Sequence, residues 1–404
     1  MTDKLTVRIY NVRFGDAILV TVPDRDPDSG VTTKRRILID VGNAPKVAGS
    51  GEGGEDEVFE PVIASILNEL GGKPLDLYVM THEHLDHVQG LFYAAKKLPA
   101  LDFANRFKVN RLWLTASAHP DYYDEDKHPN ARKKKLEFMA MFQRLQAFLS
   151  LNPAAAMHGL AELLNNNDPT KTGQCVEFLR QLNPAKTVFV HREIKKQDLK
   201  HPFKEAKFEI WAPEEDTSDY YGNFQSLDVG AVPAPVATDR STSASPAAPA
   251  ATPPSGVDLG AFLRLLDARR GGIADNLLAI DKAANNTSVV FSLEWRGWRL
   301  LFAGDAEIRS WKTMARENVL KPVHFLKVSH HGSHNGTPAD DIFDAILPQA
   351  PPDNRNRSAA ISTWTETYSG IPHQPTNDRL SSRASLHSTL DNTSQLFYEI
   401  DFPD

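Results

Sequence analysis

The chain has 404 residues, of which 41% are hydrophobic and 24% are charged, and its formal net charge is −7 at pH 7. This composition is ordinary for a globular protein with a sizeable core, and the length suits two domains or one large domain with insertions. The acidic balance argues against a general duplex-DNA binder, which usually has a basic footprint. It does not exclude an enzyme that holds phosphates through metal ions.

The compartment can be predicted from the cysteine count and the first residues. A single cysteine, Cys175, cannot form an internal disulfide, which favours a reducing compartment. Residues 1–12 are polar and alternating and lack the apolar core of a signal peptide. No apolar run reaches the roughly 18 residues of a membrane span. We therefore expect a cytoplasmic protein with no membrane partner.

The first eighty residues predict strands interrupted by one helix. Alternating or continuous apolar residues indicate strands over 5–10, 17–22, 36–42 and 76–80, and helical spacing covers 62–70. The pattern over 100–200 is mostly helical, with apolar residues at helical spacing over 136–151 and 175–182. The basic run 132–135 in this segment favours a solvated helix face over a nucleic-acid contact.

The second half begins with a change of composition. Residues 229–256 are rich in Ala, Pro, Ser and Thr, cannot bury enough apolar surface to fold, and are expected to form a disordered linker. A helix is expected over 257–284. Further strands are expected over 288–293, 299–303, 325–329, 359–362 and 397–400, with a turn over 295–298. No internal repeat is found.

Ligand-type residues are concentrated at the exit of the strand 76–80. His82, His84, Asp86 and His87 occupy six positions there. Imidazole and carboxylate groups suit zinc, manganese or iron at neutral pH. On extended chain His82 and His84 point the same way, so they can bind one ion together. Asp86 and His87 follow where the chain leaves the strand and can reach a second ion.

Two other interpretations of this run were weighed. His82-Glu83 resembles the start of the zincin motif H-E-x-x-H, but the position four after His82 is Asp86, so that interpretation fails. The other is a polar loop with chance histidines. Two later strand exits argue against it, because Asp305 follows the strand 299–303 and the pair His330-His331 follows the strand 325–329. Three ligand-bearing strand exits indicate one shared site.

In this order the segments resemble the metallo-β-lactamase superfamily, and most of all the hydrolase domain of ComEC-type DNA-uptake proteins and their free-standing relatives. The resemblance covers most of the chain, from 10 to about 375. Residues 10–17 are similar to the opening D-V-G-Q-G-D-A, although Asn11, Arg13 and Phe14 depart from it. The matching segments are 10–17, 37–42, 82–90, 285–288, 302–305, 328–333 and 372–375.

The resemblance implies one domain over 1–404 with an αββα sandwich, a mostly helical insertion over 100–200 and an inserted segment over 214–285. It implies two divalent ions, zinc or alternatively manganese. The first would be held by His82 and His84. The second would be held by Asp86, His87 and His330, with His331 as the alternative to His330. Asp305 would bridge the ions, and Asp40 would support the ligand loops.

Two elements of the family are incomplete. Many members supply another metal-binding histidine between the H-x-H-x-D-H run and the bridging aspartate. His119, His158 and His191 are available here, but none lies in a recognisable motif. The late His-Pro element reads His-Gln-Pro, and His373 is a candidate to stabilise charge or protonate the leaving group.

The expected function is metal-dependent hydrolysis, because paired ions lower the pKa of bound water and clamp the attacking and leaving oxygens. Asp86 is a further catalytic candidate, since it could orient the attacking hydroxide. The leading hypothesis is a phosphodiesterase or nuclease acting on nucleic acid or a nucleotide. The alternatives are hydrolysis of a carboxylic ester, lactone or amide, and a non-catalytic regulatory module. The 214–285 insertion is expected to be a lid, a substrate selector, a docking site for a protein partner, or a tolerated surface insertion.

Overall fold

The structure is a computed structural model that describes residues 3–44, 55–151, 160–221, 224, 273–351, 353–364, 368, 370–391 and 393–404. The linker expected over 229–256 lies outside the described residues, as does most of the helix expected over 257–284. Within the described part of the chain, no helix combines the length and the apolar character needed to cross a membrane.

Two mixed sheets form the centre of the molecule. The first has seven strands in the order β13-β1-β2-β3-β4-β5-β6, and the second has six in the order β12-β11-β10-β9-β8-β7. The strands of the first sheet are β1 (Lys4–Tyr10), β2 (Ala17–Arg25), β3 (Thr32–Val41), β4 (Leu77–Met80), β5 (Leu112–Thr115), β6 (Thr187–Val190) and β13 (Phe397–Pro403). Those of the second are β7 (Lys207–Ala212), β8 (Val290–Trp295), β9 (Trp298–Phe302), β10 (Phe325–Lys327), β11 (Ser358–Ile361) and β12 (Ser385–Ser388).

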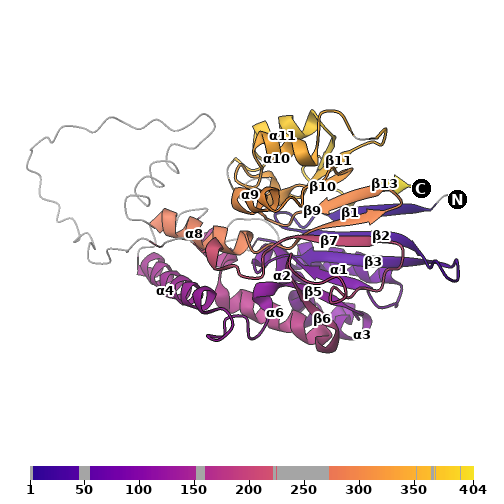
Figure 1. Ribbon diagram of the computed structural model, residues 1–404. Helices are drawn as coiled ribbons and strands as arrows, with labels where there is room; N and C mark the ends of the chain where they lie inside the picture. Colours follow the sequence, from indigo (N-terminus) through magenta and orange to yellow (C-terminus); the bar gives the residue numbers. More distant parts are fainter. Residues whose placement is uncertain are drawn as a thin grey trace, which may run out of the picture.

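Helices cover the outer faces of both sheets, so the fold is an αββα sandwich (Figure 1). The helices against the first sheet are α1 (Glu55–Leu70), α2 (Leu85–Lys97), α3 (Phe103–Arg106) and α6 (Pro169–Leu182). Those against the second are α9 (Ile308–Arg316), α10 (Asp340–Ile346) and α11 (Gln374–Ser381). A third apolar cluster lies between the sheets, where Trp113, Phe291 and Trp295 are fully buried. Three stacked apolar layers are what an αββα order requires.

The segment 100–200 contributes more to the sandwich than its mostly helical pattern predicts. It contains β5 and β6, which pair parallel with β4 and with each other. Each has four residues and is embedded in longer helical stretches, and a short apolar run of this kind cannot be assigned to strand or helix by periodicity. The strand β12 was also not predicted, because its residues are only half-buried at a sheet edge.

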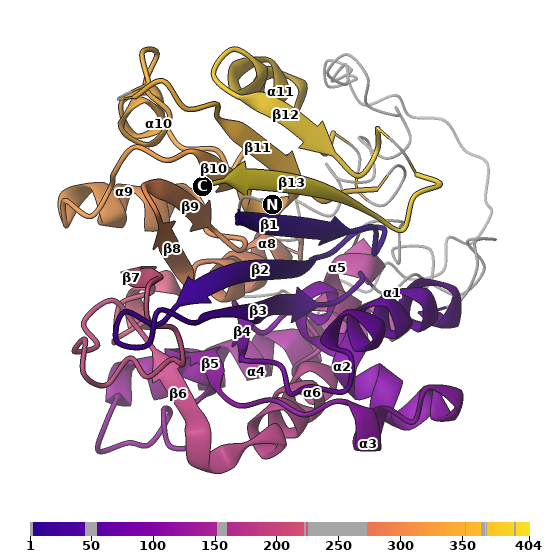
Figure 2. The ribbon, with the colours of Figure 1, turned by 90° about the vertical axis from the view of Figure 1, so that its right-hand side faces the viewer.

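The inserted helices pack on one another beside the sandwich. They are α4 (Pro129–Leu151), α5 (Leu160–Asn166) and α8 (Ile273–Asn285). Phe138, Phe142 and Leu145 of α4 form an apolar cluster with Leu277 and Ile280 of α8. Figure 1 shows α4 and α8 at the left, beyond the ends of the strands, and Figure 2 shows both sheets from another side. The segments 100–200 and 214–285, which are far apart in sequence, therefore meet at one end of the sheets.

Short 3₁₀ turns complete the described elements, and one of them carries the late histidine pair. They are η1 (Pro99–Leu101), η2 (Ala116–Ala118), η4 (Pro184–Lys186), η5 (Ser218–Tyr220) and η6 (Ser329–Gly332). His330 and His331 in η6 have φ values of 48° and 53°, in the left-handed region. Two successive non-glycine residues in this region are costly, and such strain concentrates at functional sites.

Two glycines of the N-terminal motifs allow close approach of three backbone segments. A Cβ atom on Gly42 would lie 2.1 Å from the carbonyl carbon of Asp86, and one on Gly15 would lie 2.4 Å from the Gly42 oxygen. The same segments are joined by hydrogen bonds from Asp16 N to Asp86 O (3.0 Å) and from Gly42 N to Asp16 O (2.9 Å). The start of α2 is therefore positioned by the segment just before β2 and the segment just after β3.

We predict that Gly42→Ala lowers the free energy of unfolding by about 2–3 kcal/mol, because the new methyl group must displace backbone at the start of α2. The measurement is the urea midpoint followed by circular dichroism. Gly173→Ala is the matched control, since Gly173 lies within a helix and a Cβ there meets nothing within 4 Å. Equal midpoints for the two variants would contradict the close-approach argument.

Candidate metal centre

Strand ends bring the ligand-type side chains together. β3 runs parallel to β4, and β9 runs parallel to β10, so each pair ends at one edge of its sheet. The loop after β4 carries the histidine run into α2. Asp305 follows β9, and η6 follows β10. Carboxyl ends of parallel strands are where α/β proteins place their sites.

Four buried side chains form the centre of this edge. His87 Nε2 lies 3.3 Å from Asp305 Oδ2, and His331 Nε2 lies 3.3 Å from Asp86 Oδ2 and 3.4 Å from Asp305 Oδ2. His87 Nε2 lies 3.9 Å from Asp86 Oδ2. Ligands held at about 2.0–2.2 Å from one tetrahedral zinc ion lie about 3.3–3.6 Å from one another. Three of the four distances lie in this range, and the ligand atoms of Asp86, His87, Asp305 and His331 all lie within 4.8 Å of one another, so these residues could hold one ion together.

Three buried ligand atoms of this cluster have no hydrogen-bond partner. They are His87 Nε2, His331 Nε2 and Asp305 Oδ1. The other ring nitrogens are engaged, because His87 Nδ1 lies 2.8 Å from Asp40 Oδ2 and His331 Nδ1 lies 2.8 Å from Ser362 O. A ring that donates through Nδ1 leaves its Nε2 lone pair free to bind a metal. The cluster fits a divalent ion without rearrangement.

The pKa values of the two imidazoles and of Asp86 show that the buried carboxylates stabilise a positive charge beside them. Burial lowers the pKa of His331, but the adjacent Asp305 carboxylate outweighs it and raises this pKa to about 10. Burial also lowers the pKa of His87, and Asp305 and Asp86 raise it well above the usual range. Burial would raise the pKa of Asp86, yet His87 and His331 lower it. The two carboxylates stay ionised and need a cation beside them.

His82 and His84 form a second pair of ligand atoms. His82 Nε2 lies 3.0 Å from His84 Nδ1. The Thr81 hydroxyl gives its one hydrogen to Asp40. In its 3.1 Å contact with His82 Nδ1 it must therefore be the acceptor, so His82 carries its proton on Nδ1. His84 Nε2 lies 2.7 Å from Asn167 Oδ1 and therefore carries the proton. Both rings thus turn an unprotonated nitrogen toward the same point.

Charged residues of the sandwich support the ligand pairs. Asp40, which the resemblance implied as a support, accepts from Thr81 N at 2.8 Å and from Thr81 Oγ1 at 2.6 Å as well as from His87. Lys327 and Asp16, both 1% exposed, form an ion pair of 2.8 Å beneath η6. Asp16 also lies close to Asp40 and His87. The ammonium group of Lys327 balances the negative charge of Asp16 there.

His330 lies apart from the four-residue cluster, in a neighbouring group with Asp281 and Glu307. Its Nδ1 is 3.6 Å from Glu307 Oε1, and its Nε2 is 3.4 Å from Asn285 Nδ2. Burial and the nearby Asp281 raise the pKa of Glu307 to about 8. The resemblance implied His330 as the ligand, with His331 as the alternative, and it is His331 that the structure brings to Asp86, His87 and Asp305.

The other candidate histidines lie elsewhere. His119 accepts from Asp121 N and packs on Phe189, and His191 lies beside Glu193. His158 is outside the described residues. His373 precedes α11, where its Nδ1 lies 3.1 Å from Thr376 Oγ1 and its N–H donates to Gly332 O. It is thus tied to the loop that carries His331 without being a member of the cluster.

Asn166 and Asn167 were not predicted, although they bind the ligand residues directly. Asn166 Oδ1 accepts from Asp86 N at 3.0 Å, and Asn166 Nδ2 donates to Asp86 Oδ1 at 2.9 Å. Asn167, besides its bond to His84, donates to Asp281 Oδ1 at 3.0 Å. Both asparagines are 4% exposed and come from the end of the inserted helix α5, while Asp281 comes from α8. No motif marks them in the sequence.

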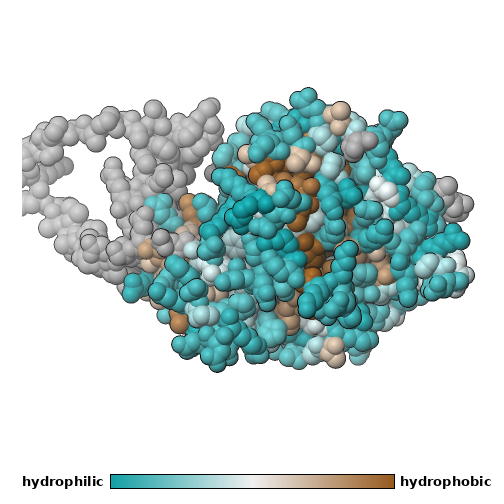
Figure 3. All heavy atoms as spheres, viewed as in Figure 1, coloured by the Kyte–Doolittle hydropathy of each residue, from teal (hydrophilic) through white to brown (hydrophobic). Residues whose placement is uncertain are grey.

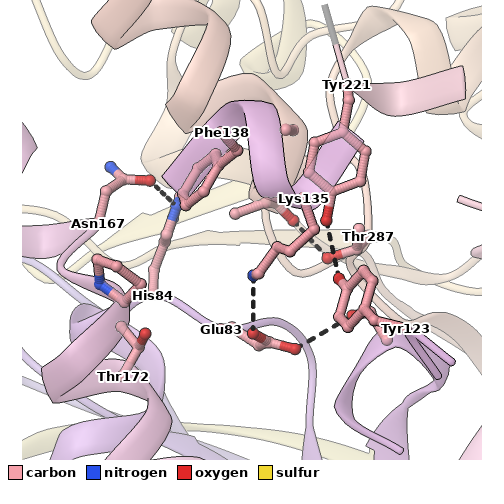
Figure 4. A pocket seen from close by; sticks show the side chains of 13 residues that line it. Glu83, His84, Tyr123, Lys135, Phe138, Asn167, Thr172, Tyr221 and Thr287 are labelled. Carbon is pink, nitrogen blue, oxygen red and sulfur yellow. Dashed lines mark hydrogen bonds and ion pairs between the residues drawn. The ribbon is translucent and has the colours of Figure 1, made fainter. Parts of the chain in front are cut away.

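The inserted helix α4 also reaches the histidine run, on the side of His84 away from Asp86. Lys135 Nζ lies 3.8 Å from Glu83 Oε2, and the Tyr123 and Tyr221 hydroxyls are 2.8 Å apart (Figure 4). The side chain of Lys135 is only 25% exposed. The solvated face predicted for the basic run 132–135 is therefore wrong for this lysine, because Glu83 and the tyrosines draw it inward.

Comparison with known proteins gives little. No protein-family model matches the sequence, and no curated protein matches it. Among solved structures, the chain is similar to a mutant of CmlA beta-hydroxylase, with 12% sequence identity and a TM-score of 0.37. The similarity covers 98% of this chain and 54% of that chain, so this chain spans about half the length of the other. Similarity at this level identifies neither a family nor an activity.

We predict that Asn167→Ala weakens metal binding about 10–100-fold, because it removes the group that fixes the His84 ring. The measurement is competition for zinc against a chelator of known affinity. Asn165→Ala is the matched control, since Asn165 lies on the same helix but contacts the exposed Lys171. Equal zinc affinity in both variants would refute the role of Asn167.

Proposed function

We propose that the chain is a metal-dependent hydrolase of the metallo-β-lactamase type, with two metal ions bound side by side. The observation that carries this proposal is the close spacing of Asp86, His87, Asp305 and His331 around unpartnered ligand atoms. His82 and His84 supply the second ion. Asp305, whose Oδ1 is buried and without a partner, would be the ligand shared by the two ions.

Zinc suits the ligands best, since imidazole nitrogens and carboxylate oxygens at tetrahedral spacing are its usual set, and manganese is the alternative. Paired ions supply an activated water and a clamp for the attacking and leaving oxygens. The chain's own residues hold the geometry: Asp40 fixes His87, Asn167 fixes His84, and Asn166 fixes Asp86. The second carboxylate oxygen of Asp86 can orient the attacking water.

The substrate class that we propose is a phosphodiester. The support is the order of the motifs, which resembles ComEC-type hydrolase domains, and the suitability of paired ions for phosphoryl transfer. The net charge of −7 favours a nucleotide or a short single strand over long duplex DNA. His373 remains a candidate for the leaving-group side, and its contact with Gly332 places it beside the loop of His331.

A second candidate is hydrolysis of a carboxylic ester, lactone or amide at the same ions. The specific observation is the cavity beside the cluster, whose described lining contains no lysine or arginine. An uncharged acyl substrate needs no such cation, whereas phosphate sites usually contain one. A non-catalytic module is disfavoured, because an intact set of oriented ligands serves no purpose in a scaffold that has lost its metal.

We predict that Asp86→Ala and Asp305→Ala each reduce turnover by at least about a thousandfold while the fold is kept, because each removes a charged ligand from the ions. The assay compares bis-p-nitrophenyl phosphate and oligonucleotides with p-nitrophenyl esters on the zinc-loaded protein. Asp121→Ala is the control, since that carboxylate is 59% exposed. Normal turnover in either ligand variant refutes the metal assignment, and turnover of esters alone refutes the phosphodiester proposal.

A further inference from the structure

A cavity of about 200 Å³ opens directly beside the candidate ligands. Its floor is polar, with Asp86, Asp305 and His84 exposed to it. Its residues come from the opening motif, α5, α8, the strand exits and the segment before α11. They are Phe14, His84, Asp86, Leu163, Asn166, Leu278, Asp281, Asp305, His330, Asn335, Tyr368 and Ile371.

Part of the cavity wall is apolar. Phe14, Leu163, Leu278 and Ile371 form it, and they come from four separate segments of the chain. Leu278 is 44% exposed, and it is one of few large hydrophobic side chains of the described residues with that exposure. On the face shown in Figure 3 the surface is mostly hydrophilic, with hydrophobic residues gathered near the middle of the view. A lone exposed leucine is unremarkable, but one that completes an apolar wall over a metal centre marks a binding surface.

Phe14 gives this wall its fixed position. Its ring packs on the ring of the ligand His331, with centroids 4.3 Å apart, and it is 3% exposed. Leu163 and Leu278 come from α5 and α8, the same helices whose Asn166, Asn167 and Asp281 hold the ligand residues. The inserted helices therefore supply both ligand supports and half of the apolar wall, while Phe14 and Ile371 come from the sandwich.

Charge in the cavity opposes a substrate with several anionic groups. Asp86 and Asp305 are matched by the metal ions, but Asp281 faces the cavity without a lysine or arginine among the lining residues. Glu307 lies behind it within the same group. A second phosphate or carboxylate at this wall would lie beside Asp281, and like charges in a partly buried site repel strongly.

We propose that this cavity is a subsite for an uncharged, apolar group attached to the scissile bond, such as a short alkyl chain or a phenyl ring. The volume agrees, since a cavity of roughly 150 Å³ accommodates benzene. The proposal rests on the proposed function for the position of the scissile group at the metals. It narrows the substrate to a small phosphodiester or ester with one apolar substituent, rather than a polynucleotide with successive charges.

The test is calorimetric binding of phosphonates to the zinc-loaded protein, which needs no turnover. The ligands are methylphosphonate, butylphosphonate, phenylphosphonate and 3-carboxypropylphosphonate. The butyl and phenyl compounds are expected to bind about 10–60-fold more tightly than the methyl compound, because full burial of each of the extra methylenes of the butyl chain would contribute about fourfold. The carboxypropyl compound has the length of the butyl compound with a charged end, and it is expected to lose that gain.

Two variants locate the effect. Leu278→Ala is expected to reduce the butyl-to-methyl affinity ratio to about threefold or less. Leu136→Ala is the matched control, because Leu136 is 60% exposed on α4 and does not line the cavity. Since both leucines are exposed, both variants are expected to fold, which thermal unfolding checks. The subsite proposal is overturned if the affinity does not change with alkyl length, or if the butyl and carboxypropyl compounds bind equally well.

The outcomes separate this proposal from the proposed function. If phosphodiesters are not hydrolysed but the phosphonate ratio and its loss in Leu278→Ala persist, the proposed function falls and the subsite stands. If the wild-type protein hydrolyses phosphodiesters but binds butylphosphonate and methylphosphonate equally well, the subsite proposal is wrong and the proposed function is kept.

Discussion

Two carboxylates, Asp86 and Asp305, are buried together against the imidazoles of His87 and His331, and this constraint orders the rest of the site. Two negative charges removed from solvent are costly unless a cation faces them. The pKa of His331 rises to about 10 for this reason, and a divalent ion satisfies the same demand without protons. The supports around the cluster follow from it. One ring nitrogen of each imidazole is held by a hydrogen bond to a neighbouring group. The other ring nitrogen is left to bind a metal ion.

The inserted helices belong to this arrangement rather than to the periphery. Asn166 binds both the backbone and the side chain of the Asp86 region, and Asn167 links His84 to Asp281 on α8. These bonds connect α5 and α8 to the two ligand pairs. The same helices supply Leu163 and Leu278 to the wall of the cavity. A displacement of the insertion would therefore alter the ligand geometry and the substrate wall together. This coupling favours the substrate-selector interpretation of the 214–285 segment over a tolerated surface loop.

Most strands could be predicted because they are apolar runs bounded by polar turns, as at 17–22 and 299–303, whereas the αββα arrangement of these strands followed only from the resemblance of the ordered motifs. The sequence was insufficient for β5 and β6, whose short apolar runs lie between helices. In the site, the chemistry of the H-x-H-x-D-H run could be predicted from its spacing. The choice between His330 and His331 could not, since it depends on left-handed φ values in η6 that send adjacent rings to different sides. Asn166 and Asn167 were missed because their proximity is created by packing of the inserted helices, which leaves no local pattern.

The most direct test of the account is the metal content of two adjacent variants, His331→Gln and His330→Gln, after loading with zinc and removal of excess ion. If His331 completes the tetrahedral set, His331→Gln should hold about one equivalent fewer than wild type, and His330→Gln should match wild type. Mass spectrometry of the metal gives the count, and circular dichroism confirms that both variants are folded. Loss of the equivalent in His330→Gln alone, or in neither variant, would contradict the assignment of His331 to the cluster of Asp86, His87 and Asp305.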